Sequence, residues 1–171
     1  MLKPFSLALA LLLVLHSPGS SHKDTHSALL GDLRVKVTAV RIASDQDVQQ
    51  YKLRPRTGYH VVLVFLNFKN VANYPSCAHF DAWLRVKQGY EYPRSSGGKM
   101  KRPQPDNLPP TEESDGGLAF EIKDGMEPAT LKLVRNILGE DFCRMTQHRE
   151  KGISGPETVN VSLQGLPANA E

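Results

Sequence analysis

Two cysteines, Cys77 and Cys143, are the first residues of this 171-residue chain that could do chemistry. An even cysteine count in an exported protein favours a disulfide, and the apolar leader described below predicts export. In the chain-entropy model such a bridge stabilises the fold by roughly 4 kcal/mol, because it closes a long loop of the unfolded chain. We therefore expect a Cys77–Cys143 disulfide, which would tie the loop before Phe80 to the segment after Phe142.

A copper site is the competing interpretation of the second cysteine. His148 follows Cys143 by five residues, a spacing that locally resembles blue-copper proteins. That chemistry also needs a second histidine, for which His60 is a formal candidate, and a weak axial ligand. Residues 149–153 contain no methionine, and Cys77 would be left as an orphan thiol. The disulfide is therefore favoured over copper.

The histidines near the N-terminus form a conditional metal site. If a signal peptidase cuts after Gly19, the mature chain begins at Ser20 with His22 in third position. A free amine, two backbone amides and that imidazole can hold Cu(II) or Ni(II) in a square plane, and His26 could add a ligand. A flexible polar leader is the favoured interpretation. If the protein binds a metal ion instead, the candidate ligands are His22, His26 and His148. No resident cofactor is expected.

Motifs for nucleophilic or metal-dependent catalysis are absent from the sequence. It has no Gly-x-Ser-x-Gly elbow, no His-Glu-x-x-His pair and no phosphate-cradling glycine loop. Cys77 and His79 are two residues apart, but sharing a strand face does not make them a hydrogen-bonded pair. We expect His79 in an exposed loop and His60 in the core or at an interface, and no catalytic residue.

Charged residues cluster at both ends of the segment from Pro93 to Gly117, which is rich in proline and glycine and is expected to be one long surface loop. Solvation is one explanation of these charges, and recognition is the other, because long loops on β scaffolds often carry binding sites. Trp83 and Phe80 alternate on different faces, so one of them should face outward or lie under the loop. The candidate partner-binding residues are Arg94, Lys99, Lys101, Arg102 and Trp83.

The first 20 residues predict a secretory signal peptide. An apolar run over residues 4–17 follows Lys3, and small residues follow at 18–21. The run is shorter than the roughly 20 residues that span a bilayer, and no cysteine stands nearby to carry a lipid. We expect a soluble secreted or periplasmic protein. Its formal net charge of +3 is too balanced to indicate nucleic acid or a membrane surface as partner.

Short strands separated by turns make up the rest of the chain. Residues 33–42 alternate as the first strand, and residues 58–70 are apolar on both faces, which predicts a central strand covered on both sides. Residues 136–152 could be helix or loop. The expected organisation is a flexible leader at 21–31, a sandwich domain at 32–165 and a tail at 166–171. Further strands are expected at 80–86 paired with 90–92, at 118–122 paired with 130–134, and at 158–163.

The fold class expected from this pattern is all-β, an antiparallel β-sandwich of about six to eight strands with at most one short helix. Three patches add a resemblance: the long strand ending at Asn67–Asn70, the aromatic arm Gly89–Tyr92, and Leu108–Pro110 leading through Gly116 to Leu133. In these the chain resembles a family of exported bacterial immunoglobulin-like β-sandwich domains of unknown function, similar to secreted mycobacterial immunogenic antigens. The resemblance implies a fold and no shared catalytic motif.

The function expected from these observations is that of an exported, non-enzymatic binding module. Its partner would be a protein or envelope component, reached through the loop from Pro93 to Gly117. The alternative is a periplasmic or extracellular copper-binding protein.

Overall fold

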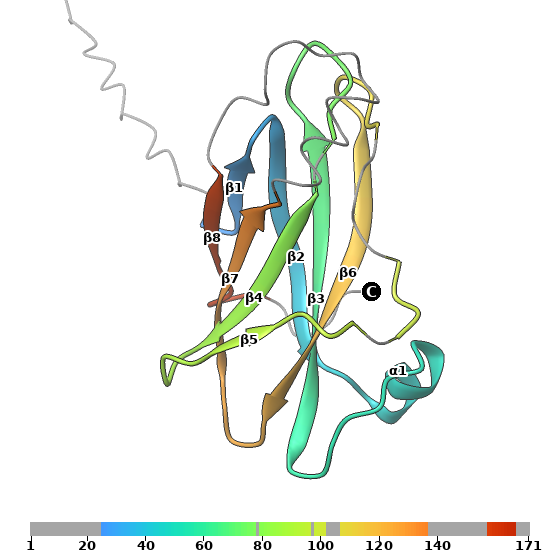
Figure 1. The fold of residues 1–171 in the computed structure, drawn as a ribbon, viewed down its shortest axis with the longest axis vertical. Coiled ribbons are helices and arrows are strands. Elements are labelled where there is room, and N and C mark those ends of the chain that lie inside the picture. The colour runs from blue at the N-terminus through green and yellow to red at the C-terminus, as the bar shows by residue number, and fades with distance from the viewer. Residues whose placement is uncertain (1–24, 78, 97, 102–106, 137–156, 167–171) are drawn as a thin grey trace, which may run out of the picture.

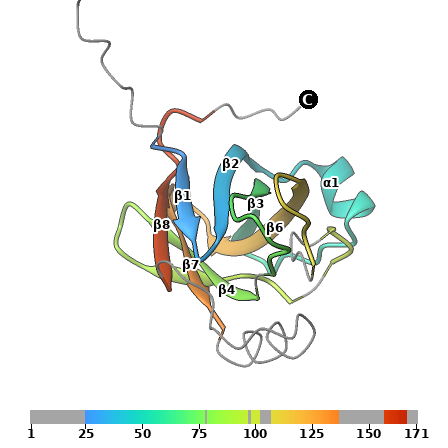
Figure 2. The same cartoon turned by 90° about the horizontal axis from the view of Figure 1, so that it is seen from above.

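The computed structural model describes residues 25–77, 79–96, 98–101, 107–136 and 157–166 as a sandwich of two antiparallel sheets, each with four strands in this part of the chain (Figures 1 and 2). This confirms the predicted fold class. One short helix, α1 (Asp45–Gln50), lies at the β6 side of the sandwich, far from β8. The first sheet has the order β1 (Ser27–Leu30), β2 (Leu33–Ile42), β3 (Tyr59–Asn70) and β6 (Glu113–Lys123). The second has the order β5 (Glu91–Pro93), β4 (Phe80–Val86), β7 (Pro128–Arg135) and β8 (Thr158–Ser162).

Alternating side chains place the core between the two sheets. In β2, Leu33, Val35 and Val37 are fully buried, while the residues between them face solvent. Across the core, the ring of Phe68 in β3 stacks on that of Phe80 in β4, with centroids 5.3 Å apart. The two aromatic rings therefore join the sheets at their most buried layer.

Strand β3 is buried on both faces, as its sequence predicted. Its inner face belongs to the main core. Its outer face carries Val61 and Leu63, which form a second apolar cluster with Leu53 and Ala119. Side chains from α1 and from the segment after β5 pack against this cluster, including Val48 and Met100. The outer face of the first sheet is therefore covered at this end.

The predicted hairpin between residues 118–122 and 130–134 is wrong. Strand β6 pairs with β3 in the first sheet, whereas β7 pairs with β4 in the second. The turn at residues 124–127 therefore carries the chain from one sheet to the other. Turn chemistry between two alternating segments marks a reversal of the chain, but it does not say which neighbour each strand will pair with.

Two other expectations need correction. Strand β1 lies within residues 21–31, which were expected to be a flexible leader. Residues 45–50, between the first two predicted strands, form the helix α1. The predicted loop from Pro93 to Gly117 ends earlier, because β6 begins at Glu113 and pairs with β3 from there. The pairing of β4 with β5 and the last strand are confirmed. Residues 137–152 of the ambiguous helix-or-loop segment lie outside the described residues.

Candidate binding site

The segment after β5 runs along the free edge of the first sheet. We call residues 94–101 the strap; residue 97 is outside the described part. The backbone N–H of Ser95 donates to the carbonyl of Ala119 (2.8 Å), and the N–H of Gly117 donates to the carbonyl of Lys101 (2.9 Å). Both bonds use β6 groups that face away from β3, so the strap covers an edge that would otherwise be open to pairing with another chain.

The strap is also fixed to the chain that follows α1. The backbone N–H of Lys99 donates to the carbonyl of Tyr51 at 2.6 Å. Gly98 has a φ of +99°, and a Cβ there would lie 2.9 Å from Leu53 Cδ2. Glycine therefore allows both the backbone conformation and the close approach of the two segments.

A pocket of about 530 Å³ lies between these two segments. We call it the strap pocket. Its apolar floor includes Leu53 and Val61, which are 7% and 5% exposed. Three exposed cations line it: Lys52 and Arg54 on one wall, and Lys99 on the strap. The full lining is Lys52, Leu53, Arg54, Pro55, Val61, Ser95, Ser96, Gly98, Lys99 and Glu121.

One carboxylate lines the strap pocket, and it already has a partner. Glu121 Oε1 accepts hydrogen bonds from the backbone N–H of Arg56 at 2.6 Å and from its Nε at 3.1 Å. The backbone hydrogen bond, helped by the guanidinium, lowers the pKa of Glu121 against the opposing effect of burial. Because Arg56 balances this charge, the three lining cations leave the strap pocket with an excess of positive charge.

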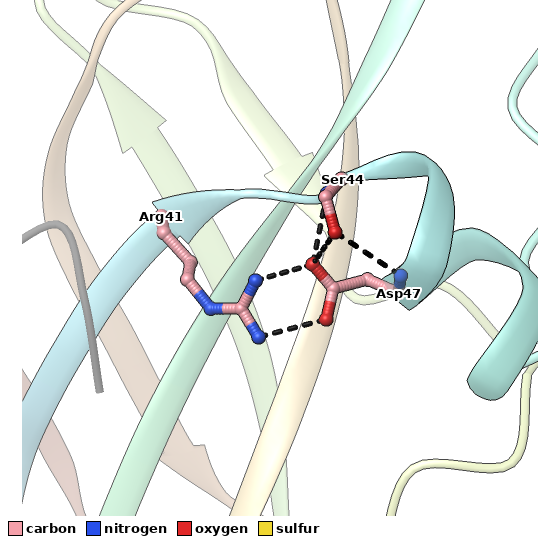
Figure 3. A network of polar contacts seen from close by, with 3 residues as sticks. All are labelled: Arg41, Ser44 and Asp47. Carbon is pink, nitrogen blue, oxygen red and sulfur yellow. Dashed lines mark hydrogen bonds and ion pairs between the residues drawn. The ribbon is translucent and has the colours of Figure 1, made fainter. Parts of the chain in front are cut away.

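A polar network fixes α1 against the first sheet (Figure 3). Asp47 forms an ion pair with Arg41 at the end of β2, with Nη2–Oδ1 at 2.7 Å and a second hydrogen bond from Nη1 to Oδ2. Ser44 and Asp47 form a capping box at the start of the helix. The guanidinium also lies 5.3 Å from the ring centroid of Phe65. This network holds the start of the segment that forms one wall of the strap pocket.

The hydrogen bonds to Asp47 change its ionisation. The Arg41 guanidinium is the main cause that lowers the pKa of this carboxyl to about 2, with contributions from the Ser44 backbone and hydroxyl. Burial acts in the opposite direction and is outweighed. Asp47 is therefore charged at every physiological pH, although the residue is only 4% exposed.

The structure divides the predicted partner-binding residues into separate places. Lys99 lines the strap pocket, and Lys101 lines a neighbouring pocket of about 360 Å³. Arg94 is half-buried where the chain leaves the second sheet, its N–H donating to the carbonyl of Ala82. Arg102 lies outside the described residues.

Trp83 lies opposite Pro93 of β5, where the strap begins, and does not line the strap pocket. It is half-buried on the outer face of the second sheet, with Lys132 Nζ 5.5 Å from the indole centroid. Its neighbour Phe80 faces the core, so the prediction that one of the two faces outward is confirmed. Trp83 is therefore near the start of the strap at Arg94, but it does not join Lys99 at the strap pocket.

The metal candidates are not assembled in the described part of the chain. His26 Nδ1 lies 3.0 Å from the carbonyl oxygen of Ser162, where it links the start of β1 to β8. His22 and His148 lie outside the described residues. Within the described ranges, no group of three or more His, Cys, Asp or Glu side chains could hold a metal ion.

His60 and His79, the other histidines among the described residues, each lie beside a neighbouring segment of the sandwich. His60 Nδ1 lies 3.0 Å from Asp124 Oδ1 in the turn after β6. His79 is half-buried, and its carbonyl accepts a hydrogen bond from the N–H of Asn136. The expectation of an exposed His79 is therefore wrong, because the end of β7 packs beside it.

Cys77 is 1% exposed. Its predicted partner Cys143 lies outside the described residues, so the disulfide stays a prediction. For the chain purified from an oxidising compartment and unfolded without reductant, we expect thiol titration to detect no free thiol, because the bridge survives denaturation. A Cys143→Ser variant should then show one thiol. Two free thiols in the unaltered chain would contradict the disulfide.

Several site residues were missed from the sequence. Lys52 and Arg54 flank Leu53 in the run from Tyr51 to Pro55, a short basic pattern between the first two predicted strands that could have marked a candidate site. The spacing of Ser44 and Asp47 is a capping-box pattern that could have predicted the start of α1.

Comparison with known families places the chain in a group without an assigned activity. A family model described as "Domain of unknown function (DUF4352)" matches residues 25–142. The chain belongs to this family. This agrees with the resemblance to exported domains of unknown function. No curated protein matches. Among the described residues, no helix has the length and apolar character required to cross a bilayer.

Solved structures with a similar arrangement share little sequence with this chain. The secreted protein MPT63 from Mycobacterium tuberculosis is 16% identical with a TM-score of 0.46, over 67% of this chain and 88% of MPT63. The protein ycdA from Bacillus subtilis is 14% identical with a TM-score of 0.47, over 82% of this chain and 38% of ycdA. An uncharacterized β-sandwich protein from Clostridium difficile is 9% identical with a TM-score of 0.37, over 66% of this chain and 84% of that protein.

Proposed function

We propose that this protein is an exported binding module without catalytic activity and that it recognises a negatively charged protein or envelope component through the strap pocket. The observation that carries the proposal is the placement of Lys52, Arg54 and Lys99 around one pocket whose single carboxylate is balanced by Arg56. Export is supported by the N-terminal apolar run, and the disulfide predicted for Cys77 and Cys143 fits an oxidising compartment.

The position of the strap supports a role in recognition. Backbone hydrogen bonds to Ala119, Gly117 and Tyr51 hold it against the sandwich, so its side chains are presented from a rigid support. A preorganised site loses less conformational entropy on binding than a free loop does. The copper-binding alternative has less support, because His26 bonds to a carbonyl and no cluster among the described residues favours a metal.

The experiment compares capture of partners from the medium and envelope fraction of the producing cells. In a pocket variant, Lys52, Arg54 and Lys99 are replaced by glutamine. In a control variant, Arg34, Lys87 and Lys123 are replaced by glutamine, which removes the same charge from exposed positions elsewhere. We expect the pocket variant to bind the captured partner roughly tenfold to a hundredfold more weakly, while the control variant binds normally. Raised salt should weaken the normal capture.

Two results would contradict this proposal. Equal loss of capture by both variants would show that net charge alone is responsible. Loss of capture by a Trp83→Ala variant, with normal capture by the pocket variant, would move the site to the outer face of the second sheet.

A further inference from the structure

The strap pocket combines two kinds of surface that small-molecule sites use. Its volume of about 530 Å³ lies within the range of roughly 300–1,000 Å³ that is typical of such sites. Leu53 and Val61 at its floor are continuous with the second apolar cluster. Little of either side chain is left exposed, so an apolar ligand group would cover mainly Pro55 and the aliphatic stems of Lys52 and Arg54 beside this floor.

The cations stand at the rim of this apolar floor. Leu53 is buried while its neighbours Lys52 and Arg54 are exposed, so the floor and one side of the rim come from consecutive residues. Lys99 supplies the opposite side from the strap. None of these three cations forms an ion pair with a described residue, and each long side chain can reach an anion at the mouth.

The two walls are held at a fixed separation. Lys99 N–H bonds to the Tyr51 carbonyl, and Gly98 packs directly against Leu53 and the same carbonyl. On the side of β6, the Ser95 N–H bonds to the Ala119 carbonyl. Backbone hydrogen bonds therefore hold both walls of the pocket in place.

We propose that the strap pocket binds one small, soluble organic anion. Its apolar body lies against Pro55 over the floor of Leu53 and Val61, and its carboxylate, sulfate or phosphate group meets Lys52, Arg54 and Lys99. This inference goes beyond the proposed function, because it assigns a second, small ligand to the same pocket. A purely inorganic anion would leave the floor uncovered, and a neutral amphiphile would leave the cations without a counter-charge. Both should bind weakly for these reasons.

The test uses the full exported chain and three probes in calorimetric titrations, all kept below micelle-forming concentrations. Octyl sulfate has both an apolar body and an anionic group, inorganic sulfate has the anion alone, and octyl glucoside has the apolar body alone. We expect octyl sulfate to bind at one site per chain, and the other two to bind at least roughly tenfold more weakly. Circular dichroism checks that each protein stays folded during the titration.

Two variants locate the bound octyl sulfate. The glutamine pocket variant described above should weaken binding by at least roughly tenfold, whereas the control variant at Arg34, Lys87 and Lys123 should bind normally. A Ser96→Trp variant keeps every charge but fills the pocket from its exposed strap position, and it should also abolish binding.

Each outcome has a defined meaning. Equal binding of octyl glucoside, several octyl sulfate molecules per chain, or full binding by the Ser96→Trp variant would overturn the inference. If octyl sulfate fails to bind but the pocket variant still loses its captured partner, the inference fails and the proposed function stands. If octyl sulfate binds as expected but capture is insensitive to the pocket variant, the small-ligand site stands and the proposed macromolecular partner fails.

Discussion

Replacing Phe68 with alanine is expected to lower the free energy of unfolding by about 3–5 kcal/mol, measured by urea denaturation. Phe68 is fully buried on the inner face of β3, and its ring stacks on Phe80 of the opposite sheet at 5.3 Å. The substitution removes the transfer free energy of the ring and leaves a cavity that two sheets cannot close without moving together. A loss of this size is a large fraction of the stability of a typical domain.

Phe65→Ala is the matched control for this prediction. It removes the same side chain from the same strand, but Phe65 is half-buried on the outer face, beside the Arg41 guanidinium. A partly exposed ring loses less apolar burial, and solvent can fill the space that it leaves. We expect less than half the effect of Phe68→Ala. Equal losses for the two variants would contradict the assignment of the main core to the space between the sheets.

Replacing Asp47 with asparagine is expected to cost about 2 kcal/mol of stability at neutral pH. The carboxylate accepts two hydrogen bonds from Arg41 and two from Ser44, and its side chain is 6% exposed. Asparagine keeps the shape but leaves the guanidinium without its counter-charge. The expected size follows from the pKa, which falls from an ordinary value of 3.8 to about 2.

The effect of Asp47→Asn should also depend on pH. Because the pKa of Asp47 is lower in the folded chain than in the unfolded chain, its contribution is fully present above about pH 4 and is lost as pH falls through about 2. The difference in unfolding free energy between the unaltered chain and Asp47→Asn should therefore shrink over this range. Urea denaturation at pH 6 and at pH 2.5 measures that difference.

Glu127→Gln is the control for the charge effect. Glu127 pairs with Lys87, but both side chains are more than half exposed, and water screens such pairs. We expect a change below about 0.5 kcal/mol. If Asp47→Asn had an equally small effect at neutral pH, the network in Figure 3 would not be what holds α1 to the sheet.

Several elements could be predicted because the spacing of their apolar residues indicates which side chains are buried. The strict alternation from Leu33 to Val37 predicts a strand with one face exposed to solvent. The apolar run from Val61 to Phe68 predicts a central strand that is buried on both faces. The arm Tyr90–Tyr92 after a turn gave the pairing of β4 with β5. These features depend on residues close together in the chain, so their pattern is visible without knowing the fold.

Only part of the candidate site could be predicted from the sequence. Lys99 and Lys101 were found as charges in a segment rich in glycine and proline, but Lys52 and Arg54 were not connected with them. Nothing in the local sequence says that residue 99 will bond to residue 51, because that contact depends on where α1 and the strap meet. From the sequence alone, a charged loop cannot be distinguished from one wall of a binding pocket, because the other wall comes from a distant segment.

By itself, the sequence determined a set of short strands and a sandwich as the way to bury their apolar faces, and it predicted a leader for export. The tertiary structure alone decided that β6 and β7 belong to different sheets, that β1 extends the first sheet, and that the strap covers the edge of β6. The physical reason is that alternation fixes which side chains face inward, whereas the choice of partner strand depends on which edges the rest of the chain leaves open.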